Sequence, residues 1–259
     1  MIELDTIFNE DCLEGMKRIP DGSVDAIICD LPYGVLNKQS EGGSWDSIIP
    51  LEPMWEQYRR IIKDNGAIVL FAQGMFTAKL MMSQPKLWRY NLVWDKVRAT
   101  GFLNANRMPL RYHEDICVFY KSLPTYNPQM EDLNGREPNH PQGHGEHVEK
   151  NSCYGKVGRI NPTYEDKKHP RSIIRIKAVH CNEGQFHPVQ KPVELLRYLI
   201  RTYTNEGDTV LDNCIGSGTT AVAAVKENRH YIGFELSKEY FDKACERIKN
   251  EQRQLKLDL

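Results

Sequence analysis

The segment that decides the fold reads Thr209-Val210-Leu211-Asp212-Asn213-Cys214-Ile215-Gly216-Ser217-Gly218-Thr219-Thr220. An apolar run leads through two glycines into an alanine-rich stretch, and this order predicts a buried strand, a tight turn and a helix. Because they lack Cβ atoms, Gly216 and Gly218 let backbone N–H groups approach a ligand at the start of the helix. The segment therefore predicts an α/β fold with a ligand site at the end of the strand.

The acid Glu235 ends the next apolar run, His230 to Phe234. A carboxylate at the end of such a strand can accept hydrogen bonds from both hydroxyls of a ribose. The Gly-Lys-Ser/Thr ending of a phosphate-binding loop is absent from the glycine turn. Turn and acid together favour a nucleoside-bearing cofactor, and an ordinary surface acid is the alternative for Glu235.

Short apolar runs alternate with amphipathic stretches along most of the chain, which predicts a mainly parallel sheet with helices on both faces. Apolar residues at helical spacing from Met54 to Ile62 predict a helix that stops at Asn65-Gly66. Pro192 is expected to open another helix, because the first turn requires no donor from it. The predicted strands cover residues 24–29, 67–71, 91–94, 116–120, 209–212 and 230–234.

A second chemical motif, Asp30-Leu31-Pro32-Tyr33, directly follows the first of these strands. An exocyclic amino group of a nucleobase is a poor nucleophile, because its lone pair is delocalised into the ring. The Asp30 carboxylate and the main-chain carbonyl of Leu31 can accept hydrogen bonds from such an amine, and Pro32 restricts Leu31 to extended conformations. Tyr33 offers a flat face on which an extruded base can stack. Taken alone, the tetrapeptide has a plain turn as its alternative.

The character of the sequence changes between residues 122 and 185, where proline, glycine, asparagine and histidine are frequent and apolar periodicity fades. From Lys121 to Lys177 there are 10 basic residues against 7 acidic ones. A solvated loop is one interpretation, and a region that contacts DNA is the other. Lys156, Arg159 and Arg171 are its candidate DNA-binding residues.

Composition sets limits on the function. The 34 basic and 35 acidic residues nearly cancel, so nucleic-acid binding would need a local basic surface. No run of apolar residues in the sequence is as long as a membrane-spanning helix requires. Seven scattered cysteines without a Cys-x-x-Cys pair indicate reduced thiols. Cys153 and Cys181 with nearby histidines could in principle bind zinc, but they lack ligand-like pairing, and no metal is expected.

The two motifs occur together in the amino-methyltransferases of DNA, and the chain resembles that family. The family signatures are Asp-Pro-Pro-Tyr and Asp-Pro-Phe-x-Gly-Ser-Gly-Thr, with Leu31 here in place of the first proline and Asn213-Cys214 in place of Pro-Phe. Smaller matches in family order lie at residues 9–13, 23–25, 45–46, 113–116 and 186–195. The resemblance covers residues 3 to 120 and 186 to 250.

This resemblance implies the Rossmann-like fold of S-adenosylmethionine-dependent methyltransferases, circularly permuted as in the family's beta class, because the catalytic motif comes first. It divides the chain into a catalytic half (1–121), an inserted, loop-rich target-recognition region (122–185) and a cofactor-binding half (186–259). By resemblance, Asp11 binds the adenine ring of the cofactor, Lys191 its methionine carboxylate, and Phe186 lines the same pocket. The remaining cofactor candidates are Asp212, Gly216, Gly218, Thr219 and Glu235.

The resemblance implies base flipping and direct methyl transfer from S-adenosylmethionine to an amino group in DNA, with adenine N6 favoured by Asp30 and cytosine N4 as the alternative. RNA and protein-glutamine methyltransferases use a related loop but place the cofactor motif first, and an inactive DNA-binding protein would have lost Asp30 or the glycines. We expect a cytoplasmic protein of a bacterium, plasmid or phage that acts on double-stranded DNA in restriction–modification. A homodimer and a cognate restriction endonuclease are partners that the resemblance allows.

Overall fold

The computed structural model describes residues 2–34, 46–132, 167–179 and 190–257, with side chains up to residue 254. The chain forms two compact units, one made of Met1–Asn127 with Ser172–Leu259 and the other of Pro128–Arg171. In the second unit the described elements are two short antiparallel strands, β6 (Glu131–Asp132) and β7 (Lys167–Lys168). The second unit falls inside the segment 122–185, and the function of that segment remains a prediction.

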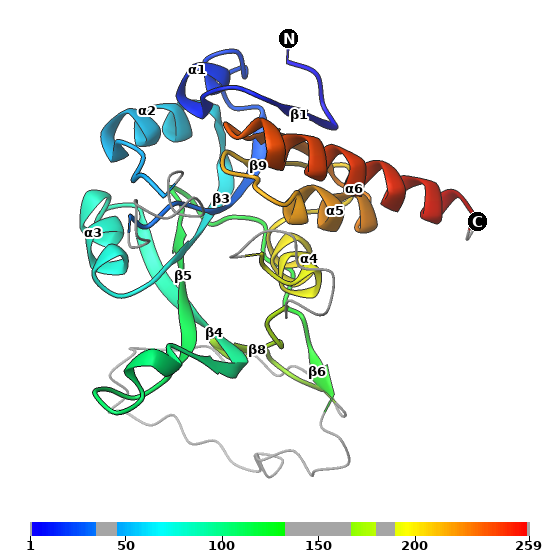
Figure 1. Cartoon of the computed structure of the whole chain (residues 1–259). Coiled ribbons are helices and arrows are strands. Elements are labelled where there is room, and N and C mark those ends of the chain that lie inside the picture. The colour runs from blue at the N-terminus through cyan, green and yellow to red at the C-terminus, as the bar shows by residue number, and fades with distance from the viewer. Residues whose placement is uncertain (1, 35–45, 133–166, 180–189, 258–259) are drawn as a thin grey trace, which may run out of the picture. The chain divides into compact units, whose positions relative to one another are not determined.

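The first unit is built around a sheet with the strand order β1-β10-β9-β2-β3-β5-β4-β8 (Figure 1). Its pairs are parallel except those that β5 makes with β3 and β4. The expected α/β fold with a mainly parallel sheet is confirmed. The strands are β1 (Thr6–Phe8), β2 (Val24–Asp30), β3 (Ile62–Ala72), β4 (Trp88–Thr100), β5 (Arg111–Phe119), β8 (Ile173–Arg175), β9 (Thr209–Asp212) and β10 (His230–Phe234).

Helices cover both faces of this sheet, as the amphipathic stretches predict. Along β2, Ala26 and Ile28 face one apolar cluster while Ile27 and Cys29 face the other, because side chains alternate along a strand. The first cluster contains residues of α4, α5 and α6, and the second contains residues of α1, α2 and α3. The helices are α1 (Cys12–Met16), α2 (Leu51–Ile61), α3 (Met75–Ser83), α4 (Val193–Tyr203), α5 (Thr219–Lys226) and α6 (Lys238–Leu257).

The predicted end of the second helix is wrong. Helix α2 ends at Ile61, and Asn65-Gly66 lies inside β3. Ile62 is already extended and pairs with Val24 of β2, so pairing in the sheet takes over before the glycine is reached. Gly66 instead lies where the register with β2 shifts, and a Cβ atom on it would come within 2.8 Å of the Asp25 carbonyl oxygen.

The starts of α4 and α5 matter for the site. Helix α4 begins at Val193. Pro192, which was expected in the first turn, is the N-cap and directly precedes that turn. Helix α5 follows Gly218, which has a φ of 73° and leaves only 3.1 Å between a hypothetical Cβ atom and the Cβ of Ala244 in α6. Glycine at 218 is therefore required by both its backbone conformation and the packing of α6.

No helix among the described residues is long and apolar enough to span a bilayer.

Candidate functional site

A cavity of about 930 Å³ lies where β2, β9 and β10 end at their carboxyl-terminal edge. Both sequence motifs line it, although they are far apart in the chain, because β2 and β9 are adjacent parallel strands. Gly218 is not among the lining residues, since it packs against α6. The predicted site residues that line the cavity are Asp11, Asp30, Leu31, Pro32, Tyr33, Lys191, Asp212, Gly216, Thr219 and Glu235.

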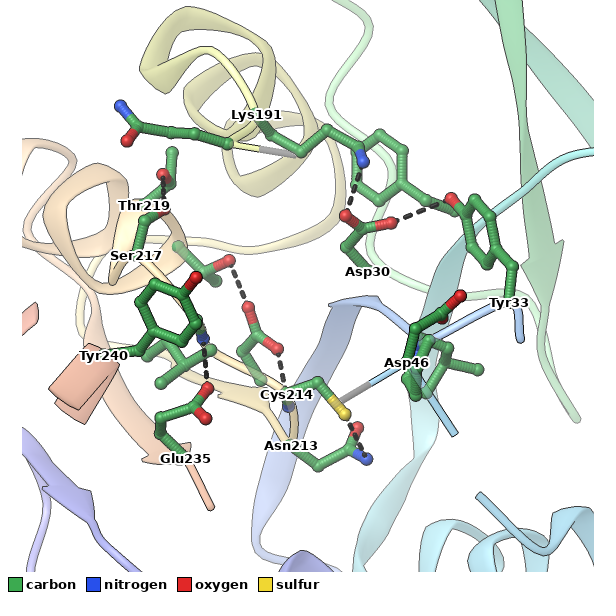
Figure 2. A pocket seen from close by; sticks show the side chains of 18 of the residues that line it. Asp30, Tyr33, Asp46, Lys191, Asn213, Cys214, Ser217, Thr219, Glu235 and Tyr240 are labelled. Carbon is green, nitrogen blue, oxygen red and sulfur yellow. Dashed lines mark hydrogen bonds and ion pairs between the residues drawn. The ribbon is translucent and has the colours of Figure 1, made fainter. Parts of the chain in front are cut away.

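Asp30, the last residue of β2, receives hydrogen bonds on both carboxylate oxygens (Figure 2). The Tyr33 hydroxyl donates to Oδ1 over 2.8 Å, and Lys191 Nζ donates to Oδ2. Burial raises the pKa of Asp30, and the charge of Lys191 opposes this rise. Burial and the nearby negative charges also raise the pKa of Tyr33 well above its ordinary value, so Tyr33 stays a donor. The carboxylate is thus held in one orientation at the cavity wall.

Leu31 and Tyr33 fix the loop that carries this motif. The Leu31 side chain is 3% exposed and packs in the apolar cluster of α1, α2 and α3. Its substitution for the family's proline is therefore accommodated by burial. The Tyr33 ring lies 5.2 Å from the Phe76 ring of α3, and the Gly34 N–H donates to Asp46 over 2.9 Å. Sequence reasoning did not assign this role to Asp46, although Trp45-Asp46 is one of the family matches.

The Lys191 ammonium is buried next to two carboxylates. It pairs with Asp30 and lies 3.3 Å from Oε2 of Glu114, and Glu114 in turn pairs with Lys96 over 2.5 Å. The expected contact between Lys191 and a methionine carboxylate stays a prediction. Lys96 is a site residue that sequence reasoning missed, because an isolated lysine in a strand carries no pattern.

The glycine turn is held together by Asp212. Its Oδ1 accepts from the Cys214 N–H over 3.0 Å, and its Oδ2 accepts from the Thr220 hydroxyl over 2.6 Å. Burial raises the pKa of Asp212 to about 6, although both hydrogen bonds lower it. The Thr219 hydroxyl is 2.9 Å from that of Ser217. Asp212 thus links the end of β9 to the glycine turn and to the start of α5 by hydrogen bonds.

Two acids that were predicted to bind the cofactor, Glu235 and Asp11, accept hydrogen bonds from backbone N–H groups. Glu235 accepts from the Gly216 N–H over 2.9 Å with one oxygen and from the Ser237 N–H over 2.8 Å with the other, and burial raises its pKa. Asp11 is the N-cap of α1 and accepts from the Leu13 N–H over 2.8 Å. Each carboxylate oxygen can accept more than one hydrogen bond, so both acids can serve a ligand as well.

Asn213 explains the second departure from the family pattern. It is 2% exposed, its amide oxygen accepts from the Tyr58 hydroxyl, and its amide nitrogen lies 3.6 Å from the sulfurs of both Cys12 and Cys214. The buried amide therefore links α2, α1 and the glycine turn beneath the cavity.

A basic and apolar loop borders the cavity. It connects β4 to β5 and includes a short 3-10 helix, Phe102–Asn104, in which Phe102 is 68% exposed and Leu103 fully so. Thr100, Gly101 and Arg111 line the cavity. Arg98, Arg107 and Arg111 are exposed, and no acidic residue occurs in the sequence from 97 to 112.

Some predicted residues lie outside the described part of the chain, namely Phe186, Lys156, Arg159, Cys153 and Cys181. Arg171 is exposed and lies 3.5 Å from Glu131 within the second unit, and its contact with DNA stays a prediction. Within the described ranges, no three His, Cys, Asp or Glu side chains cluster in a way that could hold a metal ion.

Comparison with known proteins gives one family and several similar chains. A family model for DNA methylases of the N6 and N4 type matches residues 24–246. The type II methyltransferase M.HpaI of Haemophilus parainfluenzae is 27% identical over 246 residues, covering 92% of this chain and 72% of that protein. The structure of the M1.HpyAVI–SAM complex aligns with a TM-score of 0.59 at 24% identity, covering 93% of this chain and 98% of that one. The cytosine-N4-specific PvuII DNA methyltransferase aligns with a TM-score of 0.65 at 15% identity, covering 96% and 91%.

Proposed function

Since the chain belongs to the N6 and N4 DNA methylase family, we propose that it methylates adenine N6 in double-stranded DNA with S-adenosylmethionine as the methyl donor. At the level of the family, the chain is an S-adenosylmethionine-dependent DNA methyltransferase of adenine N6 or cytosine N4. One observation carries the proposal. A single cavity is lined by Asp30 and Tyr33 on one side and by Gly216 and Glu235 on the other.

The residues on the glycine-turn side fit the cofactor. A volume of about 930 Å³ is large enough for a nucleoside and a second planar group together. Glu235 and Asp11 offer carboxylate acceptors for ribose hydroxyls and an adenine amine, and Lys191 offers a cation for a carboxylate. When bound, S-adenosylmethionine supplies an electrophilic methyl group on a sulfonium.

On the opposite wall, Asp30 and the Leu31 carbonyl accept hydrogen bonds from the target amine. These acceptors favour a pyramidal nitrogen whose lone pair points at the methyl carbon. Transfer of that methyl group would form an N–C bond while the C–S electron pair leaves on sulfur, and the amine would then release one proton to solvent. Tyr33 holds the Asp30 carboxylate and lines the cavity, where its ring can stack on an extruded base.

Adenine is favoured over cytosine by the residue at position 30. By the resemblance to the family, Asp rather than Ser at this position favours adenine N6, although both chemistries present an amine to the same acceptors. The fold is shared by enzymes of both specificities and does not distinguish adenine from cytosine, because the cytosine-N4-specific PvuII enzyme aligns over 96% of the chain.

Access to duplex DNA is supported by the loop between β4 and β5. Phe102 and Leu103 expose apolar surface near the cavity, and Arg98 and Arg107 add positive charge. Apolar side chains can replace stacking that a flipped base gives up, and arginines bind phosphates. We propose that this loop contacts DNA, and a DNA contact of the segment 122–185 is a separate prediction from the sequence.

The proposal is tested by expressing the chain in a bacterial host that lacks DNA methylation and sequencing the genome with modification-sensitive chemistry. We expect N6-methyladenine at one recurring short sequence, and none in cells that express the Asp30→Asn variant. Methylation confined to cytosine N4 would overturn the choice of base. An unmodified genome, with the protein shown to be folded and present, would overturn the function.

A further inference from the structure

Four charged side chains of alternating sign lie next to one another along the cavity wall and end at Asp30. Lys96 pairs with Glu114, Glu114 lies 3.3 Å from Lys191, and Lys191 pairs with Asp30. The side chains of the first three are only 9–11% exposed, and that of Asp30 is 21% exposed. Two ammonium groups and two carboxylates sum to zero charge, which is the condition under which such a cluster can be buried.

The cluster draws on elements that are separate in the chain. Lys96 is on β4, Glu114 on β5 and Asp30 on β2, while Lys191 precedes α4. Aromatic rings enclose the cations, since Lys191 Nζ is 5.1 Å from the centre of the Phe71 ring and Lys96 Nζ is 5.6 Å from that of Trp94. The low polarity of this wall strengthens each charge–charge interaction.

We propose that Glu114 and Lys96 are positioning residues for methyl transfer, which hold Lys191 between two carboxylates and thereby set the charge and orientation of Asp30. This inference rests on the proposed function, in which Asp30 accepts the target amine. Neither residue lies within the Asp30–Tyr33 motif, and each acts through a neighbour: Lys96 on Glu114, and Glu114 on Lys191.

The electrostatic directions agree with this geometry. Burial would raise the pKa of Glu114, but the charges of Lys191 and Lys96 bring it below its ordinary value. Burial raises the pKa of Asp30; Lys191 lowers it and the charge of Glu114 raises it further. The other titratable groups that face Asp30 are Tyr33 on the same loop, Cys29 on β2 and Asp212 on β9.

The balance matters because the reaction creates positive charge. The target amine becomes cationic as it takes the methyl group, so it needs an ionised acceptor beside it and no uncompensated cation. If Glu114 were neutral, two ammonium groups would face one carboxylate. If Lys96 were neutral, Glu114 would draw Lys191 away from Asp30.

The test measures kcat/KM for duplex DNA against pH, at saturating S-adenosylmethionine, because the acidic limb of this profile reports ionisation of the cofactor-bound enzyme before DNA binds. Glu114→Gln should lower kcat on the order of tenfold and move the acidic limb about one pH unit down, because Asp30 then has Lys191 to itself. Lys96→Met should move the limb up by a similar amount. Lys96→Arg keeps the charge and should leave the limb in place.

A double variant separates positioning from general damage. In the Glu114→Gln background, Lys96→Met should move the limb no further, because Lys96 acts only through Glu114. The matched control is Lys63→Met, which breaks an ion pair with Asp25 at the other end of β2 and should leave the profile unchanged. Shifts that add in the double variant, or limbs that coincide with the wild type in folded Glu114→Gln and Lys96→Met variants, would overturn the inference. A wild-type protein that transfers no methyl group to DNA at any pH would instead overturn the proposed function.

Discussion

Ala26 of β2 and Val210 of β9 are paired residues of adjacent parallel strands, although they lie near opposite ends of the chain. Because both strands run in the same direction, their carboxyl ends meet at one edge of the sheet. Asp30 leaves the first strand there and the glycine turn leaves the second. The pairing therefore creates a cavity in which a methyl donor and an amine acceptor can face each other. Disruption of either strand end should affect both cofactor binding and binding of the target amine.

The two roles of Tyr33 can be separated by substitution. The hydrogen bond from Tyr33 lowers the pKa of the Asp30 carboxyl. Tyr33→Phe removes this bond and so raises that pKa, and the acidic limb of kcat/KM should move to higher pH. Tyr33→Ala also removes the ring and should weaken binding of DNA with an unpaired target base by roughly tenfold more than Tyr33→Phe does, as loss of one stacking contact would. Equal affinities of the two variants, measured by fluorescence anisotropy, would argue against stacking.

Glu235 is expected to bind the cofactor ribose. Glu235→Gln keeps one acceptor oxygen but loses the charge, and affinity for S-adenosylmethionine measured by calorimetry should fall on the order of tenfold, as for loss of a charged hydrogen bond. Glu239→Gln on α6 is the control, since Glu239 pairs with Lys243 on the exposed surface. Cofactor affinity that is unchanged in the first variant would exclude the ribose contact.

The buried carboxyl of Asp212 makes stability depend on pH. Its pKa is raised by burial to about 6, whereas an unfolded aspartate titrates near pH ~4. The folded protein therefore binds this proton more tightly, and the contribution to stability is lost as pH rises from about 4 to about 6. In Asp212→Asn this dependence should disappear, and the free energy of unfolding at pH 7 should be higher by on the order of 1 kcal/mol. Parallel stability curves for the two proteins from urea denaturation would contradict this.

The end of β4 and the loop that follows it should bind phosphates. The double variant Arg98→Gln/Arg107→Gln should weaken DNA binding at every sequence and reduce the slope of log K against log salt by about 2, one for each lost phosphate contact. Lys249→Gln, an exposed position on α6, is the control. A slope that stays at the wild-type value would place these arginines outside the interface.

Much of the fold follows from local pattern. The strands 209–212 and 230–234 begin and end where predicted, because apolar runs bounded by turn residues have few alternatives in a parallel sheet. The helix before β3 was predicted too long, since the pairing of Ile62 with Val24 outweighs helical spacing. Helix α3 was missed, because six of its nine residues are apolar without a clear period.

The candidate site divides in the same way. Asp30 and Glu235 could be predicted because each directly follows a predicted strand, and Gly216 because it lies in the glycine turn after another, where the sites of such folds lie. The pairing of Lys191 with Asp30 spans 161 residues and depends on which strands are neighbours. Lys96 and Asn213 carry no sequence signal of their own, since their roles come from burial beside Glu114 and Tyr58.

Acceptance of the target amine by the Asp30 carboxylate is the interaction on which methyl transfer depends. It is tested most directly by Asp30→Asn, which keeps the size of the side chain and one acceptor, in parallel assays of tritiated methyl transfer to duplex DNA and of S-adenosylmethionine binding by calorimetry. We expect transfer to fall by a factor on the order of 100 or more, while the dissociation constant of the cofactor changes little. Transfer that persists at the wild-type rate in this variant would contradict the account.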